Sequence, residues 1–197
     1  MKPYFQNHSA GWLFLIVLIC FFGMEVIQFF RQRGWRQDAT RIATPGFWAG
    51  VVVWVIVATV VLHRAGHYLP GATMGNGAFV FAAGMVLLVT GAGLRWWSFW
   101  ALGPYFTFTV DVSADQQVVT AGPYGMLRHP GYAGGLLAMI GIGVIYSNWA
   151  GLAGFTLSCL AIVLWRIHIE ETALLLTAGD SYRVYASDRK RLIPLVW

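Results

Sequence analysis

The fold is decided by residues 131–167, which read GYAGGLLAMIGIGVIYSNWAGLAGFTLSCLAIVLWRI. This stretch is apolar almost throughout, and a helix needs about 20 such residues to cross a membrane. Residues 131–146 and 149–167 are therefore each predicted to form a spanning helix. Because only Ser147 and Asn148 separate the two runs, we expect a tight antiparallel hairpin.

Three further apolar runs precede the hairpin, over residues 10–30, 46–62 and 77–97. The chain is 58% hydrophobic and 11% charged, whereas an average soluble domain is about 25% charged. This composition argues against a soluble enzyme or a disordered chain. We predict an all-α integral membrane bundle of five transmembrane helices, with a long polar loop over residues 98–130 and a helical C-terminal tail. Glu25 interrupts the first run and is expected to have a partner, since an isolated charge is costly in lipid.

Basic residues are distributed unevenly among the predicted loops, and lysine and arginine accumulate in cytoplasmic loops. With five spans, one side holds eleven of the thirteen basic residues and the other side holds two. We therefore predict that the N-terminus lies outside and that loop 98–130 and the C-terminus are cytoplasmic. The net charge of +5 follows from this rule, so no nucleic-acid partner is predicted. The eleven are Arg31, Arg33, Arg36, Arg41, Arg95, Arg128, Arg166, Arg183, Arg189, Lys190 and Arg191, and the two are Lys2 and Arg64.

Small residues form a stripe along each helix of the hairpin, and such stripes let two helices approach closely in lipid. We expect the two hairpin helices to pack against each other along these stripes, which brings their polar ends together on the cytoplasmic side. The stripes are Gly131, Gly135, Ala138 and Gly141 on one helix, and Gly151, Gly154, Ser158 and Ala161 on the other.

The first polar end is the segment Arg128-His129-Pro130. Proline suits the first turn of a helix because its missing N–H would be unpaired there. Free N–H groups at a helix start attract anions, and Arg128 and His129 add positive charge. The segment predicts a seat for a carboxylate or phosphate. The alternative is an ordinary helix start with an arginine that reaches toward the interface.

The second polar end is Arg166-Ile167-His168-Ile169-Glu170-Glu171. Adjacent carboxylates at a membrane boundary repel each other, so they usually have cationic partners. The alternative is a solvated helix end in which Arg166 pairs with one of the glutamates.

The order and spacing of these two clusters and their flanks resemble the isoprenylcysteine carboxyl methyltransferase and phospholipid methyltransferase family of membrane enzymes. The resemblance covers roughly residues 100–194. It departs from the family pattern at Gly125, Gly131 and Ala178, which affects the expected substrate more than the reaction. The residues that carry it are Leu102-Gly103, Phe106-Thr107, Val118-Val119, Gly122-Pro123-Tyr124, Arg128-His129-Pro130, Tyr132, Gly134, Arg166, Glu170-Glu171, Leu174, Gly179, Tyr182, Tyr185 and Arg191-Leu192-Ile193-Pro194.

The resemblance implies S-adenosylmethionine as the methyl donor and S-adenosylhomocysteine as the product. The residue types agree, because the carboxylate of this cofactor needs cations, its ammonium needs a carboxylate and its adenine needs apolar walls. The cofactor-binding residues expected on this basis are Val118, Val119, Gly122, Tyr124, Arg128, His129, Tyr132, Glu170 and Glu171.

The expected catalytic residues are Arg166 and Glu171. Arg166 would orient an anionic acceptor that arrives from the lipid, and Glu171 would order Arg166 or the cofactor. A carboxylate acceptor is already ionised at neutral pH and needs no base, whereas an amine or thiol would need one, from Glu171 or His168. A lipophilic or lipidated substrate, most specifically an isoprenylcysteine-like carboxylate, is the favoured acceptor. A phospholipid amine or a small thiol is the alternative.

The chain divides into an expected three-helix membrane anchor, residues 1–97, and a catalytic region, residues 98–197, that contains the hairpin 131–167. The competing class is a non-enzymatic membrane protein that carries haem or transports a small molecule. No metal site is predicted, because the cysteines lie inside apolar runs and the only close histidine pair has no second pair of ligands. The oligomeric state is left open. The residues concerned are Cys20, Cys159, His63 and His67.

Overall fold

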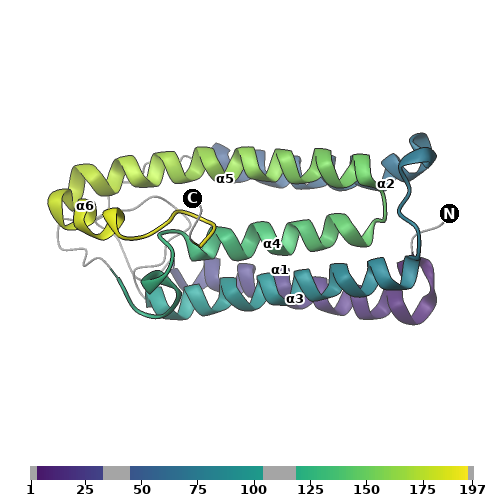
Figure 1. Cartoon of the computed structure of the whole chain (residues 1–197), viewed down its shortest axis with the longest axis horizontal. Coiled ribbons are helices and arrows are strands. Elements are labelled where there is room, and N and C mark those ends of the chain that lie inside the picture. Colours follow the sequence, from purple (N-terminus) through teal and green to yellow (C-terminus); the bar gives the residue numbers. More distant parts are fainter. Residues whose placement is uncertain (1–3, 33–44, 104–118, 195–197) are drawn as a thin grey trace.

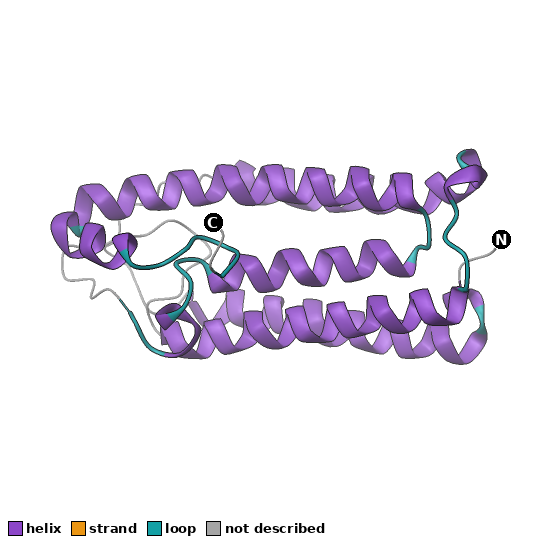
Figure 2. Ribbon diagram, in the orientation of Figure 1, coloured by secondary structure: helices purple, strands orange, loops and turns teal. Residues whose placement is uncertain are grey.

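The structure is a computed structural model that describes residues 4–32, 45–103 and 119–194. The described part is helical, and no strand is drawn in it (Figure 2). The elements are η1 (Tyr4–Gln6), α1 (His8–Gln32), α2 (Pro45–Tyr68), η2 (Pro70–Ala72), α3 (Gly77–Leu102), η4 (Gly122–Gly125), α4 (Pro130–Ile145), α5 (Trp149–Thr177) and α6 (Gly179–Ser187). The all-α prediction is confirmed.

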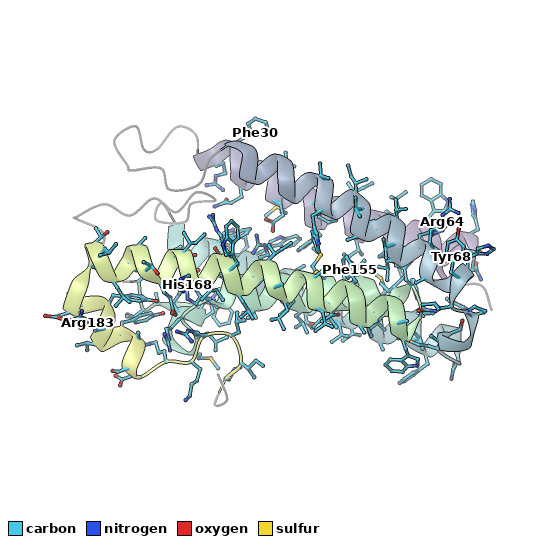
Figure 3. The ribbon with its side chains drawn as sticks, turned by 90° about the horizontal axis from the view of Figure 1, so that it is seen from above. Phe30, Arg64, Tyr68, Phe155, His168 and Arg183 are labelled. Carbon is cyan, nitrogen blue, oxygen red and sulfur yellow. The ribbon has the colours of Figure 1, made fainter. Side chains whose placement is uncertain are left out.

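The long helices run along one common axis, and α4 lies between α3 and α5 (Figure 1). Figure 3 shows Arg64 and Tyr68 at one end of the bundle and Arg183 at the other. Many apolar side chains on the outer faces are exposed, for example Ile16 at 55% and Leu157 at 65%. In water such a surface would aggregate, but it is the surface that lipid requires.

Three helical segments of the described chain are long and apolar enough to cross a membrane, namely His8–Gln28, Gly77–Leu102 and Trp149–Thr177. Helix α4, Pro130–Ile145, is also apolar but shorter. The membrane-embedded, multi-pass character of the chain is therefore confirmed. The count of five spans stays a prediction.

We expected the small-residue stripes of α4 and α5 to pack against each other, and this prediction is wrong, because the stripe of α4 packs against α3 instead. The stripe of α4 lies against α3, where a Cβ added at Gly91 would come 2.3 Å from the backbone nitrogen of Ala138. A Cβ added at Gly141 would likewise come 2.5 Å from the nitrogen of Leu88, whereas one at Gly154 of α5 would meet nothing within 4 Å. The reason is that α3 carries its own glycines, so its backbone approaches α4 more closely than α5 does.

The tight hairpin between α4 and α5 is confirmed. Ser147 adopts a positive φ of 56°, and the fully buried Asn148 caps α5 by accepting a hydrogen bond from the Gly151 nitrogen at 2.9 Å. The Asn148 amide also donates to the carbonyl of Leu69 at 3.0 Å. This turn therefore ties the end of α2 to the hairpin.

Helix α5 extends to Thr177, ten residues beyond the predicted end of the span at Ile167. It continues because Glu170 and Glu171 have partners there. Gly179, at a φ of +53°, ends it in the manner of a left-handed helix cap. The expected helical tail is present as α6, which folds back beside the end of α5 (Figure 1).

Candidate active site

The two polar clusters predicted from the sequence meet where the start of α4 lies beside the end of α5. Pro130 is the first residue of α4 and His129 precedes it. On α5, Arg166 and Glu171 are buried, at 7% and 8% exposure, and both lie in this region. The convergence of the two clusters is thus confirmed.

Glu171 is the centre of the site. Its Oε1 accepts a hydrogen bond from Arg128 Nη1 at 2.9 Å and lies 3.1 Å from His129 Nε2. Its Oε2 accepts from Arg191 Nη2 at 2.9 Å and from Arg191 Nε at 3.0 Å. These hydrogen bonds hold the pKa of the Arg191 guanidinium above its ordinary value. Glu171 therefore joins α5, the start of α4 and the tail through one carboxylate.

A second chain of contacts connects α4 to α5 on the membrane side of Glu171. The Tyr132 hydroxyl donates to Glu170 Oε2 at 2.7 Å and accepts from Arg166 Nε at 3.2 Å. The tyrosine thus stands between a carboxylate and a guanidinium. This arrangement orients the buried Arg166 toward α4.

The tail binds the segment before α4 through its backbone. The N–H groups of Arg128 and His129 donate to the carbonyls of Lys190 and Arg191, at 2.8 and 3.1 Å, and Arg128 Nε donates to the carbonyl of Arg189 at 2.9 Å. Figure 1 shows the tail running back to the start of α4.

The expected anion seat of free N–H groups at the start of α4 is therefore wrong in part. The N–H groups of Tyr132 and Ala133 both donate to the His129 carbonyl, and the tail takes those of the two residues before Pro130. These four N–H groups have acceptors within the protein, as buried N–H groups usually do. The positive charge of the seat rests on side chains.

Two tyrosines of α6 are buried beside this site and differ in their hydrogen bonds. The Tyr185 hydroxyl donates to the carbonyls of Tyr124 and Leu127, at 3.0 and 3.2 Å, and burial raises the pKa of Tyr185 to about 12. The Tyr182 hydroxyl is buried and has no hydrogen-bond partner among the described residues. Burial, together with the charges of Glu171 and Glu170, raises the pKa of Tyr182.

Of the other predicted cofactor residues, some lie at the site and others do not. Tyr124 is buried, and its hydroxyl is 3.9 Å from a Cβ built on Gly131, so it belongs to the site. Gly122 lies instead against α3, where a Cβ added to it would come 3.1 Å from Trp97 Nε1. Val119 is half-buried, and Val118 lies outside the described residues.

Other candidates from the sequence lie apart from the site. His168 is exposed on α5. His63 and His67 are exposed near the opposite end of the bundle, beside Arg64 (Figure 3). In the described ranges no group of three or more potential metal ligands occurs.

Sequence reasoning missed the site roles of Arg191 and Tyr182, which carry the family resemblance but have no role assigned by the pattern. The available signal was the spacing of Tyr182 and Tyr185, which puts both rings on one face of a short helix. It also missed the partner of Glu25, which is Arg95 of α3. Arg95 lies at a predicted loop boundary, and nothing in a single sequence shows that two residues 70 positions apart are in contact.

The chain is similar to known membrane methyltransferases. The family model "Phospholipid methyltransferase" matches residues 79–177. A probable protein-S-isoprenylcysteine O-methyltransferase of Oryza sativa subsp. indica is 28% identical over 195 residues, covering 95% of this chain and 97% of the relative. The protein-S-isoprenylcysteine O-methyltransferase of Tribolium castaneum is 31% identical over 115 residues, which are 57% of this chain and 41% of that one.

A solved structure shares the fold. It is the eukaryotic intramembrane Ras methyltransferase ICMT, isoprenylcysteine carboxyl methyltransferase, without a monobody. It superposes with a TM-score of 0.63 at 24% identity, over 79% of this chain and 55% of that chain. This chain thus matches about half the length of the solved protein.

Proposed function

Because this chain belongs to the phospholipid methyltransferase family, we propose that it transfers a methyl group from S-adenosylmethionine to a lipophilic acceptor reached from the membrane. The chain is a membrane methyltransferase. The acceptor we propose is the carboxylate of an isoprenylcysteine-like substrate, the group that appears in the names of the rice and beetle relatives.

The observation that carries this proposal is the buried Arg166 on α5, beside Tyr132 and at the lipid side of the Glu171 cluster. An arginine inside a membrane helix is costly in lipid and is usually functional. A planar guanidinium suits a carboxylate, because it can donate two parallel hydrogen bonds to it. The buried Arg166 guanidinium would therefore orient the carboxylate of an acceptor that enters from the lipid.

The residues present fit S-adenosylmethionine. When bound, this cofactor supplies a methyl group activated by a sulfonium. Arg128 and His129 would hold its carboxylate, Glu170 its ammonium, and Tyr124 would lie against its adenine. The buried Tyr182 hydroxyl supports the fit, because an unpaired buried hydroxyl is unfavourable and a bound ligand would give it a partner.

The protein's part in the reaction is mainly alignment. Arg166 would orient the acceptor carboxylate, and Tyr132 and Glu170 would keep the guanidinium in place. No residue has to remove a proton, because the carboxylate is already ionised at neutral pH. Arg166 would thus present the acceptor oxygen to the methyl group that the bound cofactor supplies.

An amine or thiol acceptor fits the described residues less well. Such an acceptor needs a base, and the candidates are Glu171 and His168. Glu171 is already engaged by Arg128, His129 and Arg191, and His168 is exposed on α5. Among the residues that the structure describes, these positions therefore favour a carboxylate.

We also propose that the site faces the cytosol, with the N-terminus outside. The asymmetry of basic residues supports this orientation, and it agrees with a cytosolic methyl donor. The division into an anchor, residues 1–97, and a catalytic region, residues 98–197, is proposed with one amendment. Arg95 of α3 contacts the start of α4, so the anchor contributes to the site.

The test has two stages. S-adenosylhomocysteine should raise the thermal midpoint of the detergent-purified protein, since a ligand that binds only the folded state stabilises it. His129→Ala and Glu170→Ala should each weaken its binding about tenfold or more, because each leaves a charged part of the ligand unpaired. A flat response in the wild-type protein would contradict the proposal, and haem absorption in the purified protein would support the non-enzymatic alternative.

The second stage identifies the acceptor. Labelled methyl donor is offered with an S-farnesylated cysteine that has a free carboxyl, with the same compound as its carboxamide, and with vesicles that contain phosphatidylethanolamine. We expect a base-labile methyl ester from the first compound only. Label in the lipid amine would instead support the phospholipid alternative, and label in the carboxamide would exclude carboxyl methylation.

A further inference from the structure

An ion pair inside the bundle connects α1 to α3. Arg95 Nη2 lies 2.8 Å from Glu25 Oε2, and Arg95 Nε donates to Glu25 Oε1, so the contact is bidentate. The two side chains are only 15% and 18% exposed. Charged residues at such positions in membrane helices are costly and are usually functional.

The same guanidinium makes a third hydrogen bond, to the start of α4. Arg95 Nη1 donates to the carbonyl of Gly131 at 2.9 Å, and the guanidinium carbon lies 4.9 Å from the centre of the Phe99 ring. Gly135 leaves room for it, because a Cβ there would come 3.2 Å from Arg95 Nη1. One side chain therefore connects Glu25 of α1 to the first turn of α4.

That first turn is held from both sides. On the side of α5, His129 contacts Glu171 and Tyr132 contacts Glu170. On the side of α3, Arg95 holds the Gly131 carbonyl, one residue before Tyr132. A shift of the turn would therefore move Tyr132 against Arg166.

We propose that Glu25 and Arg95 are positioning residues for methyl transfer. Arg95 holds the first turn of α4 so that Tyr132 and Arg166 stay aligned toward the acceptor, and Glu25 neutralises Arg95 and fixes its orientation. The inference rests on the proposed function and deepens it. It extends the functional unit to α1, which lies outside the matched residues 79–177.

The competing explanation is that the pair only ties α1 to α3. The two explanations differ for a variant that removes both charges. Replacing a buried ion pair by apolar residues of similar volume is often neutral or stabilising. If the pair only ties α1 to α3, the variant without both charges should be folded and active. If the pair positions α4, the same variant should be folded, but the first turn of α4 would have lost its support from Arg95.

The decisive experiment compares the wild-type chain with Glu25→Met/Arg95→Met. We expect a thermal midpoint at or above that of the wild-type protein. Affinity for S-adenosylhomocysteine should fall much less than turnover, because His129 stays held by Glu171 and by its backbone hydrogen bond to Arg191. Turnover at saturating donor should fall about tenfold or more, since a misplacement of about 1 Å at a reacting centre is costly.

Arg95→Lys provides a second variant should the double variant fail to fold. It keeps the charge beside Glu25 but cannot reach both carboxylate oxygens and the Gly131 carbonyl together. We expect a near-normal midpoint and the same loss of turnover. Wild-type turnover in either folded variant would overturn the proposal. A wild-type protein that fails to bind S-adenosylhomocysteine would instead remove the proposed function and this inference with it.

Discussion

His129 and Glu171 are 42 positions apart, yet His129 Nε2 lies 3.1 Å from Glu171 Oε1. The contact joins the start of α4 to the end of α5, and both residues are buried. The same carboxylate holds Arg128 and Arg191. The α4–α5 turn alone does not impose this contact, because it lies at the opposite end of the hairpin, so the site depends on Glu171 itself.

Glu171→Gln should lower both stability and cofactor binding. It leaves Arg128, His129 and Arg191 without their shared anion, and breaking a buried pair costs about 3 kcal/mol or more. The thermal midpoint should fall by about 5 °C or more, measured in detergent without ligand. Arg183→Gln is the control, because its pair with Asp180 is exposed and should contribute little. Equal midpoints for Glu171→Gln and Arg183→Gln would contradict the central role of Glu171.

Tyr182→Phe and Tyr185→Phe should separate ligand binding from stability. Tyr182→Phe removes a hydroxyl without a partner in the described protein, so the free protein should keep its midpoint while S-adenosylhomocysteine binds about fivefold more weakly. Tyr185→Phe removes the donor to Tyr124 and Leu127 and should lower the midpoint of the free protein. Calorimetric titration and thermal melts provide both readouts. Unchanged affinity in Tyr182→Phe would remove this residue from the ligand site.

Arg166→Lys should separate the chemical step from cofactor binding. Lysine keeps the charge but loses the planar fork, and it cannot reproduce the contact of Arg166 Nε with the Tyr132 hydroxyl. We expect near-normal binding of S-adenosylhomocysteine and a loss of about tenfold or more in turnover at saturating donor. Single-turnover kinetics would measure this difference. Full activity in the variant would transfer the orienting role to another residue, such as Arg128.

Gly91→Ala should disrupt the bundle, whereas Gly93→Ala should not. A Cβ at Gly91 would come 2.3 Å from the Ala138 nitrogen, and one at Gly93, on the same helix, would meet nothing within 4 Å. Backbone cannot yield as a flexible side chain can, so α3 and α4 would have to move apart. The yield of monodisperse protein and its thermal midpoint would show the difference. Equal yields and equal thermal midpoints for the two variants would show that α3 and α4 do not approach each other at Gly91.

Single cysteines would test the orientation in the membrane. After Cys20 and Cys159 are replaced by alanine, a cysteine at Gly75 should react with an impermeant thiol reagent applied outside the cell. One at Asp188 should react only after the membrane is opened. Both positions are exposed, so access to the reagent depends on the side of the membrane. The reverse pattern would put the site on the side without a cytosolic donor.

Much of the fold was predictable because membrane helices are read from uninterrupted apolar runs. The helix partners were not, because periodicity shows which face of a helix is small but not which neighbour lies against it. Gly91 of α3 therefore looked like any residue of an apolar run, although it is what lets α4 pack there. The apolar run ends at Ile167, so it does not show that α5 continues to Thr177, where Glu170 and Glu171 bind partners from α4.

The parts of the site that are formed by charged side chains were predictable from the sequence. The hairpin predicted over residues 131–167 indicated that the segments of Arg128 and Glu171 would meet. The hydrogen bonds from Arg128 and His129 to the tail were not predictable, because any residue has a backbone carbonyl and the pairing leaves no pattern in residue type. The Glu25–Arg95 pair was half predicted, since the cost of Glu25 required a partner without identifying it.

The pairing of Leu127 with Lys190 has a consequence for the order in which the protein folds. This contact closes a much longer loop of chain than the two-residue turn between α4 and α5, so it costs more conformational entropy. While the tail is undocked, Glu171 stays on α5 but the N–H groups of Arg128 and His129 lack their tail partners. We therefore expect the α4–α5 hairpin to form first and the site to close last, when the tail docks.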